Sequence, residues 1–164
     1  MNISRKIVRC GFDSPWGPMT LVAHDDALVW VCFDGQKHAP DFSQWPVSTG
    51  HPILRMAADE LRQYFAGERS QFDVPVDLNR GTPFQQSVWT ALLSISFGAT
   101  VSYGTISQSL GKARAVRAVG GAVGRNPISI IVPCHRVVAS NGALTGYAGG
   151  LPRKVALLHL ENHL

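Results

Sequence analysis

The sequence is poor in cysteine and has no long hydrophobic run, and both shortages restrict the class of protein. Cys10, Cys32 and Cys134 are odd in number and widely spaced among 164 residues, so neither a disulfide scaffold nor a zinc ribbon is expected. No apolar run approaches the ~18 residues that cross a bilayer, and no charged and then apolar leader stands at the N-terminus. We therefore expect a globular, cytoplasmic protein without a membrane segment and without a bound metal.

Acidic residues are absent from most of the second half. From Leu78 to Leu160 there is no aspartate or glutamate, although this stretch carries eight lysines and arginines, whereas the first 77 residues hold ten acidic and seven basic side chains. A surface with one sign of charge attracts a polyanion, so the charge distribution favours a nucleic-acid partner. The alternative is a basic half that only complements the acidic half within one molecule.

Residues 1–76 predict an α/β domain, a small antiparallel sheet with one helix. Strands are expected at Ile3–Asp13, Met19–His24 and Leu28–Phe33, with a turn at Ser14–Pro18 between the first two. Residues 36–52 are rich in proline, serine and glycine and predict a loop. Pro52–Phe65 then places apolar side chains at helical spacing before Gly67, and residues 68–81 predict an extended connection.

Residues 77–164 predict a second, mostly helical domain. Its first helix should begin after Thr82 and run to about Ile95, because Thr82, Pro83 and Gln85 have the order of a capping box with proline at the first helical position. Further helices are expected at Ser102–Leu110, Ala113–Val123 and Lys154–His163. Two short helices joined by a tight glycine turn are typical of a helix-turn-helix. We expect the helices at Ser102–Leu110 and Ala113–Val123 to form one.

A thiol and an imidazole are adjacent in the run Pro133-Cys134-His135-Arg136, and the apolar run Ile128–Val132 before it predicts a buried strand. The thiolate is the nucleophilic form, and a free thiol with a pKa of ~8.5 is only slightly ionised at neutral pH, so a base is needed. Adjacent side chains do not readily bond each other, and we therefore expect His135 to take the proton through a water. Glu161, the only carboxylate after Asp77, would orient the imidazole in a relay similar to the serine triad. Arg136 is expected to serve as a structural ion-pair or hydrogen-bond donor.

These motifs resemble the O6-alkylguanine-DNA alkyltransferase family from about Thr82 to the C-terminus. The resemblance rests on Pro133-Cys134-His135-Arg136-Val137, on Arg117-Ala118-Val119-Gly120, on Asn126-Pro127 and on the segment from Asn141 to Gly150. The N-terminal half agrees mainly in the Ser14–Pro18 turn and in Tyr64-Phe65-Ala66-Gly67. The resemblance implies direct-reversal DNA repair without a cofactor, in which a single-use methyltransferase moves an alkyl group from O6 of guanine in duplex DNA to its own cysteine. O4-alkylthymine stays open as a second substrate.

The resemblance also implies roles for the residues around the thiol. Cys134 would be the acceptor thiolate, activated by His135 and Glu161. Tyr103 would contact the target nucleotide, assist its extrusion and donate a proton to the departing guanine, although a tyrosine at a helix start also commonly packs on a core. Lys154 would favour a deprotonated thiol, and a solvated position on the helix surface is its alternative.

The DNA contacts that the resemblance implies lie in the basic half. Arg117 would fill the gap that an extruded base leaves in the stack, or contact a phosphate instead, and Arg114 lies on the same helix face. Arg125 would add a further contact to DNA. The helices would enter the minor groove, and the protein is expected to be a monomer that needs no protein partner.

The guanine pocket would be lined by Tyr147, Ala148 and Gly149, and Asn126 would tie backbone segments together as a hinge before the active-site run. At Ala148 many relatives carry a serine that can bond the lesion oxygen, so the ranking of alkyl substrates is open. Two other functions also stay open. One is a non-catalytic protein that binds alkyl lesions, against which Cys134 argues, and the other is a helix-turn-helix regulator.

Overall fold

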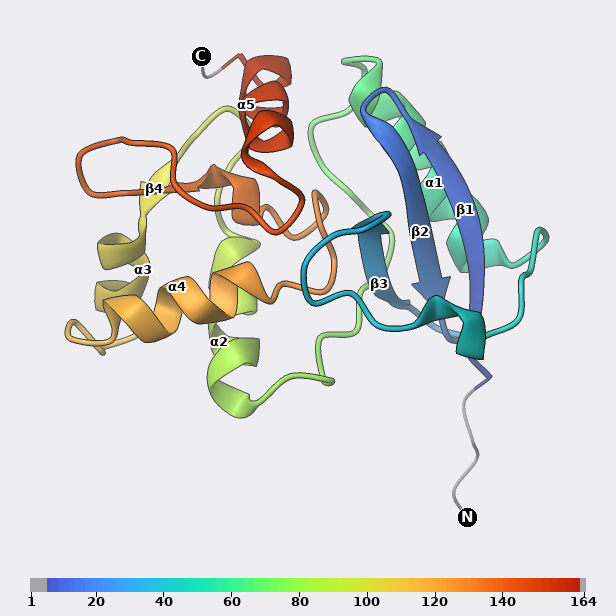
Figure 1. Ribbon diagram of the computed structural model, residues 1–164, viewed down its shortest axis with the longest axis horizontal. Helices are drawn as coiled ribbons and strands as arrows, with labels where there is room; N and C mark the ends of the chain where they lie inside the picture. Colours follow the sequence, from blue (N-terminus) through green and yellow to red (C-terminus); the bar gives the residue numbers. More distant parts are fainter. Residues whose placement is uncertain (1–5, 163–164) are drawn as a thin grey trace.

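An antiparallel three-stranded sheet forms the N-terminal part of the computed structural model, which describes residues 6–162 (Figure 1). The strands are β1 (Val8–Ser14), β2 (Gly17–Ala23) and β3 (Leu28–Phe33), paired in the order β1-β2-β3. The turn between β1 and β2 needs Gly17 at a φ of 120°, and the Ser14 hydroxyl accepts a hydrogen bond from the Trp16 N–H at 3.2 Å. The predicted sheet is confirmed. Its first strand starts later than expected, at Val8, and the predicted start at Ile3 lies outside the described residues.

Helix α1 (Pro52–Phe65) covers one face of this sheet (Figure 1). The His51 side chain caps its first turn by accepting from the Ile53 N–H. The face toward the sheet buries side chains at helical spacing: Leu54, Ala57, Leu61 and Tyr64. The extended connection that follows is tied back to α1, because the Glu60 carboxylate accepts from the Asp73 and Val74 N–H groups at 2.6 and 2.9 Å.

Four helices form the C-terminal part: α2 (Pro83–Leu92), α3 (Tyr103–Ser109), α4 (Val116–Gly124) and α5 (Leu151–Leu160) (Figure 1). The predicted capping box begins α2, since the side chains of Thr82 and Gln85 each accept from the other residue's N–H. Trp89 of α2 donates its indole N–H to the Ala122 carbonyl of α4 at 2.8 Å. Helices α3 and α4 pack against each other after a turn, which is the arrangement of a helix-turn-helix.

The ends of α3 and the end of α4 lie within one residue of the predictions. Larger differences occur where α2 ends at Leu92 and not Ile95, and where α4 and α5 begin at Val116 and Leu151 and not at Ala113 and Lys154. Before α4 the Ala115 N–H donates to the Lys112 carbonyl at 2.8 Å, so a turn takes up the predicted first residues. Before α5 the chain turns at Gly150 with a φ of 94°, directly ahead of the helix. The predicted end at His163 lies outside the described residues.

The predicted strand at Ile128–Val132 is wrong, because these residues form a looped segment that makes only one bridge, between Ile128 and Val31 of β3. The Asn126 side chain takes up the backbone groups that a strand would pair. Its amide donates to the Val132 carbonyl at 2.8 Å and accepts from the Ile128 N–H at 3.0 Å. Ile130 adopts a φ of 71°, which is incompatible with a strand.

Two kinds of element were not predicted. One is a short parallel pair between β4 (Val101–Ser102) and β5 (Val137–Val138), and the other is the 3₁₀ turns η1 (Phe42–Gln44) and η2 (Cys134–Arg136). The parallel pair joins the segment after Cys134 to the start of α3. The predicted domain boundary after residue 76 falls in the connection between α1 and α2 and stays a prediction. Within residues 6–162, no helix has the length and apolar character to cross a membrane.

Candidate active site

Cys134 lines a small cavity that both halves of the chain enclose. This residue is 5% exposed to solvent and is the first residue of the 3₁₀ turn η2. The cavity has a volume of about 200 Å³, and its lining includes Tyr103, Gly120, Tyr147 and Ala148 from the C-terminal half and Lys37 and His38 from the N-terminal half. Three of the predicted site residues, Tyr103, Tyr147 and Ala148, therefore meet the thiol in one cavity.

The thiol of Cys134 is protonated in the resting protein. Burial raises its pKa to about 11, although a hydrogen bond from the Asn126 side chain and the charge of Lys154 both lower it. The nucleophilic thiolate is therefore scarce at neutral pH, and a base must take the proton when the reaction occurs.

The nearest base in the sequence, His135, is fully buried and paired with Glu161. Its Nε2 lies 2.8 Å from Glu161 Oε2. An ionised carboxylate only accepts hydrogen bonds, so Nε2 carries the proton and Nδ1 is left with a lone pair. Nδ1 is buried and bonds to no other group among residues 6–162. Burial lowers the pKa of His135 more than Glu161 raises it, so the imidazole is neutral and able to accept a proton.

The Glu161 carboxylate is held by donors on both oxygens. Arg136 donates Nε to Oε1 at 2.7 Å and Nη2 to Oε2 at 3.0 Å, and the Tyr64 hydroxyl donates to Oε2 at 2.6 Å. The Gly98 N–H lies 3.5 Å from Oε1. Burial would raise the pKa of Glu161, but the hydrogen bonds from His135 and Arg136 hold it well below its usual range. Arg136 is thus a structural ion-pair partner, as expected.

Lys154 is fully buried, so the solvated alternative for this residue is wrong. Its ammonium group donates to the carbonyls of Val137, Thr145 and Gly146 at 2.6, 2.8 and 3.3 Å. These bonds tie the loop that carries Tyr147 to β5, directly beside the active-site turn. Lys154 therefore holds the cavity wall in place, in addition to placing positive charge near the thiol.

Two of the three residues predicted to line the guanine pocket line the cavity, and the third does not. Tyr147 and Ala148 line the cavity, whereas Gly149 lies buried outside it, where an added Cβ would stand 2.8 Å from the Tyr147 ring and 3.1 Å from the Phe33 ring. The Ala148 carbonyl accepts from the Lys37 N–H at 3.2 Å. Glycine is therefore required at 149 for close packing, and the N-terminal half is fastened directly to the pocket loop.

The predicted DNA contacts lie outside the cavity. Arg114, Arg117 and Arg125 are all exposed, before, on and after α4 respectively. Tyr103 both lines the cavity and packs against α4. It is half-buried at the start of α3, and its ring faces Gly120 of α4, so both packing and a contact with a nucleotide are open to it.

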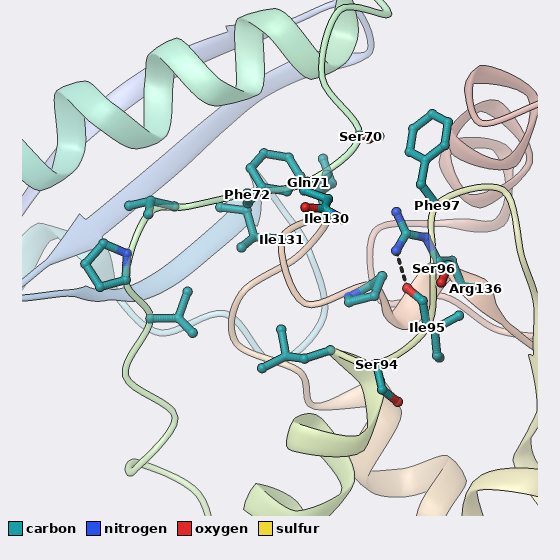
Figure 2. Close-up of a pocket in the computed structure, with 15 residues that line it drawn as sticks. Ser70, Gln71, Phe72, Ser94, Ile95, Ser96, Phe97, Ile130, Ile131 and Arg136 are labelled. Atoms are coloured by element: carbon teal, nitrogen blue, oxygen red, sulfur yellow. Dashed lines mark hydrogen bonds between the residues drawn. The ribbon is translucent and has the colours of Figure 1, made fainter.

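A larger groove, with a volume of about 790 Å³, lies behind the active-site turn and does not include Cys134 (Figure 2). In it the Arg136 guanidinium donates Nη1 to the Ile95 carbonyl at 2.6 Å and lies 5.8 Å from the centre of the Phe97 ring. The groove shares Arg136 with the relay, and no cysteine is among the residues that line it. No three histidine, cysteine, aspartate or glutamate side chains within residues 6–162 are placed to hold a metal ion.

Sequence reasoning missed three residues at the site. Lys37 and His38 sit in a loop predicted only from its composition, and nothing in that loop marks them as cavity residues. Tyr64 belongs to a motif noted for its resemblance, but its bond to Glu161 joins residues 97 positions apart. All three come from the N-terminal half.

Comparison with known proteins covers nearly the whole chain. Two family models match, "6-O-methylguanine DNA methyltransferase, ribonuclease-like domain" over residues 7–78 and "6-O-methylguanine DNA methyltransferase, DNA binding domain" over residues 83–163. The "Methylated-DNA--protein-cysteine methyltransferase" of Mycobacterium tuberculosis is 52% identical over 149 residues, which are 91% of this chain and 88% of that protein. The constitutive protein of the same name from Bacillus subtilis is 42% identical over 153 residues, covering 91% and 92%.

Solved structures agree with these matches. The O6-methylguanine methyltransferase of Mycobacterium tuberculosis superposes with a TM-score of 0.87 at 50% identity, over 94% of this chain and 92% of that one. The structure of the same organism's protein in complex with DNA matches with the same TM-score and coverage at 49% identity. The chain described here therefore belongs to the 6-O-methylguanine DNA methyltransferase family.

Proposed function

We propose that the protein repairs alkylated DNA by direct reversal, moving the alkyl group from O6 of guanine to the sulfur of Cys134 and being consumed in the process. The observation that carries this proposal is a buried thiol that lines a cavity and directly precedes a His135–Glu161 pair. Family membership supports the same chemistry, because the relatives are named as methyltransferases that act on methylated DNA and a protein cysteine.

The proposed transfer begins with the neutral imidazole. The lone pair of His135 Nδ1 takes the Cys134 proton through a water, and Glu161 stabilises the imidazolium that forms. The thiolate attacks the alkyl carbon in line with the C–O6 bond, so that a C–S bond forms as the C–O6 bond breaks. Guanine leaves with the electron pair and takes a proton, for which the Tyr103 hydroxyl in the cavity wall is the proposed donor. The thioether is stable, and the protein acts once.

The target base must leave the duplex to reach this cavity, because O6 of a stacked guanine is out of reach of a buried thiol. We propose that α3 and α4 enter the minor groove and that Arg117 fills the gap in the stack, with a phosphate contact as its alternative. Arg114 and Arg125 would bind the DNA backbone on the same side of the molecule. The exposed side chain of Lys37 at the cavity would add positive charge near the flipped nucleotide, and the exposed His38 lies beside it.

Ala148 is the feature that would set substrate preference. It offers the lesion oxygen no hydroxyl, and its carbonyl is already bonded to the Lys37 N–H. Contacts to the lesion at this point would therefore have to come from backbone N–H groups. A monomeric state, a cytoplasmic location and activity on O4-alkylthymine stay predictions.

The test is the intact mass of the protein after incubation with a duplex that contains one O6-methylguanine. The proposal predicts one added methyl group per protein and none in Cys134→Ala, with the same duplex bound in both cases. An unchanged mass with selective binding of the lesion would instead make the protein a lesion binder. Binding that ignores the lesion would make it a DNA-binding regulator.

A further inference from the structure

Tyr64 reaches from the N-terminal half into the active-site network of the C-terminal half. It lies near the end of α1, is fully buried and donates its hydroxyl to Glu161 Oε2 at 2.6 Å. This is the same carboxylate oxygen that lies 2.8 Å from His135 Nε2. The proposed transfer steps leave this hydroxyl without a role.

The Tyr64 ring is fixed by aromatic packing on several sides. Its centre lies 5.5 Å from the centres of the Phe65 and Phe72 rings and 6.2 Å from that of Phe97, and Phe97 also contacts the Arg136 guanidinium. Figure 2 shows Phe97 beside this guanidinium and Phe72 on the opposite side of the larger groove. A ring clamped in this way presents its hydroxyl to Glu161 at one fixed position.

The hydroxyl acts as a permanent donor. Burial, reinforced by the negative charge of Glu161, holds the pKa of Tyr64 far above its ordinary value, so the group is protonated at neutral pH. Because the residue is fully buried, water does not compete for this hydroxyl, and its bond goes to the Glu161 carboxylate.

We infer that Tyr64 is a positioning residue for alkyl transfer, through which α1 fixes and partly neutralises the carboxylate that orients His135. The inference rests on the proposed function. It gives the N-terminal half a part in the chemistry, because the relay then extends from Cys134 and His135 through Glu161 to a helix of the other domain.

Because Tyr64 and His135 bond the same oxygen of Glu161, the direction in which loss of the Tyr64 hydroxyl moves the pKa of His135 can be predicted. The negative charge of the Glu161 carboxylate is stabilised by hydrogen bonds from the Tyr64 hydroxyl, the Arg136 guanidinium and the His135 N–H. Removing the hydroxyl leaves more of that charge to the imidazole, which would then hold a second proton more tightly. The charged groups that face His135 are Glu161, Arg136 and Lys154, and only the Glu161 contact changes. The neutral base would therefore form at higher pH than in the wild type.

The experiment is single-turnover methyl transfer from an O6-methylguanine duplex, measured against pH for the wild type and for Tyr64→Phe. Binding of the duplex should be equal in the two proteins, and the final yield should stay at one methyl group. The acid limb of the rate profile should move to higher pH by roughly 0.5 to 1 unit in Tyr64→Phe. Below this limb, transfer should be about three- to tenfold slower than in the wild type.

The matched control is Phe72→Leu, which loosens the packing around the Tyr64 ring without removing its hydroxyl. This variant should lose stability and keep the wild-type acid limb. The inference is overturned if the limb of Tyr64→Phe coincides with that of the wild type, or if Phe72→Leu shifts it equally. Failure of the proposed function would look different, because the wild type itself would then transfer no methyl group.

If Tyr64→Phe does not fold, the hydrogen bond from the Tyr64 hydroxyl to Glu161 can be tested in the wild type. With tyrosines labelled at the ring carbon that bears oxygen, NMR should detect a Tyr64 hydroxyl proton that exchanges slowly with water, identified by its proximity to the Phe72 and Phe97 rings. The same proton should lose its downfield shift in Glu161→Gln. A rapidly exchanging hydroxyl, or one that ignores this substitution, overturns the inference.

Discussion

Glu161→Gln is the substitution that tests the electrostatic design of the site most severely. The side chain keeps its shape, loses its charge and replaces one oxygen with an NH₂ group. In the structure, Oε2 receives the Tyr64 hydroxyl, Arg136 Nη2 and the His135 N–H, and Oε1 receives Arg136 Nε. An amide therefore places its own donor against existing donors, whichever way it is turned.

The best arrangement for the glutamine changes the tautomer of His135. A hydroxyl and a neutral imidazole can both switch from donor to acceptor, whereas a guanidinium cannot. Arg136 donates to both oxygens, so either orientation of the amide loses one of its bonds, but at the Oε2 position the NH₂ group also meets two groups that can accept. The NH₂ group should therefore face Tyr64 and His135, so that Nε2 accepts and Nδ1 carries the proton. Nδ1 of His135 then has no lone pair with which to accept the Cys134 proton. Transfer should therefore slow by about 10³- to 10⁴-fold.

The same substitution should lower the stability of the fold. Arg136 is buried and loses the only carboxylate that pairs with it in residues 6–162, which should cost about 3–5 kcal/mol of unfolding free energy. The pKa of Glu161 is depressed in the folded protein, so its contribution is complete above its unfolded pKa of ~4.3 and is lost as the pH falls toward the folded value. The stability gap between wild type and variant should thus be constant near neutral pH and should narrow in acid.

The assays are urea unfolding over a range of pH and single-turnover transfer from an O6-methylguanine duplex. Glu60→Gln is the matched control, because Glu60 is also a buried carboxylate but accepts from the Asp73 and Val74 N–H groups and lies 4.0 Å from Arg69 Nη1. It should cost stability and leave the transfer rate unchanged. A Glu161→Gln variant that transfers within about threefold of the wild-type rate would refute the relay reasoning.

Three further outcomes are expected. Reaction of Cys134 with iodoacetamide in the free protein should rise about tenfold per pH unit without levelling off near neutral pH, since its pKa is about 11, and a plateau at pH 7–8 would contradict this. Lys154→Met should lower the free energy of unfolding, measured in urea, by about 2–4 kcal/mol, because three carbonyls lose their donor. A loss under about 0.5 kcal/mol would contradict this structural role of Lys154. Arg117→Ala should slow transfer from duplex DNA far more than from free O6-benzylguanine, and equal losses would remove the wedge role.

The parts of the fold that follow from the sequence are those whose signal is local. The capping box of Thr82 and Gln85 begins a helix where predicted, and the turn at Gly17 joins two strands where predicted. Ile128–Val132 has the composition of a strand, yet the neighbouring Asn126 amide takes its backbone hydrogen bonds and Ile130 adopts a positive φ. Composition cannot reveal that a single side chain competes with a sheet.

The same limit applies to the site. His135 and Glu161 could be paired from the sequence because the basic half has one carboxylate to offer. Lys154 could not be placed, since a lysine four residues into a helix is usually solvated and its three carbonyl partners lie in β5 and in the loop that follows it. Tyr64 and Lys37 enter the site only through contacts between the two halves, and such contacts leave no mark in the spacing of residues.

The most direct measurement uses a duplex whose O6-methylguanine carries a deuterated methyl group. After one turnover the protein is digested, and its peptides are mapped by mass spectrometry. We expect the deuterated methyl on the sulfur of Cys134 and on no other residue, together with an unmodified guanine in the duplex. A label on another side chain, or a methyl group that stays on the DNA while the protein remains bound to it, would contradict the account.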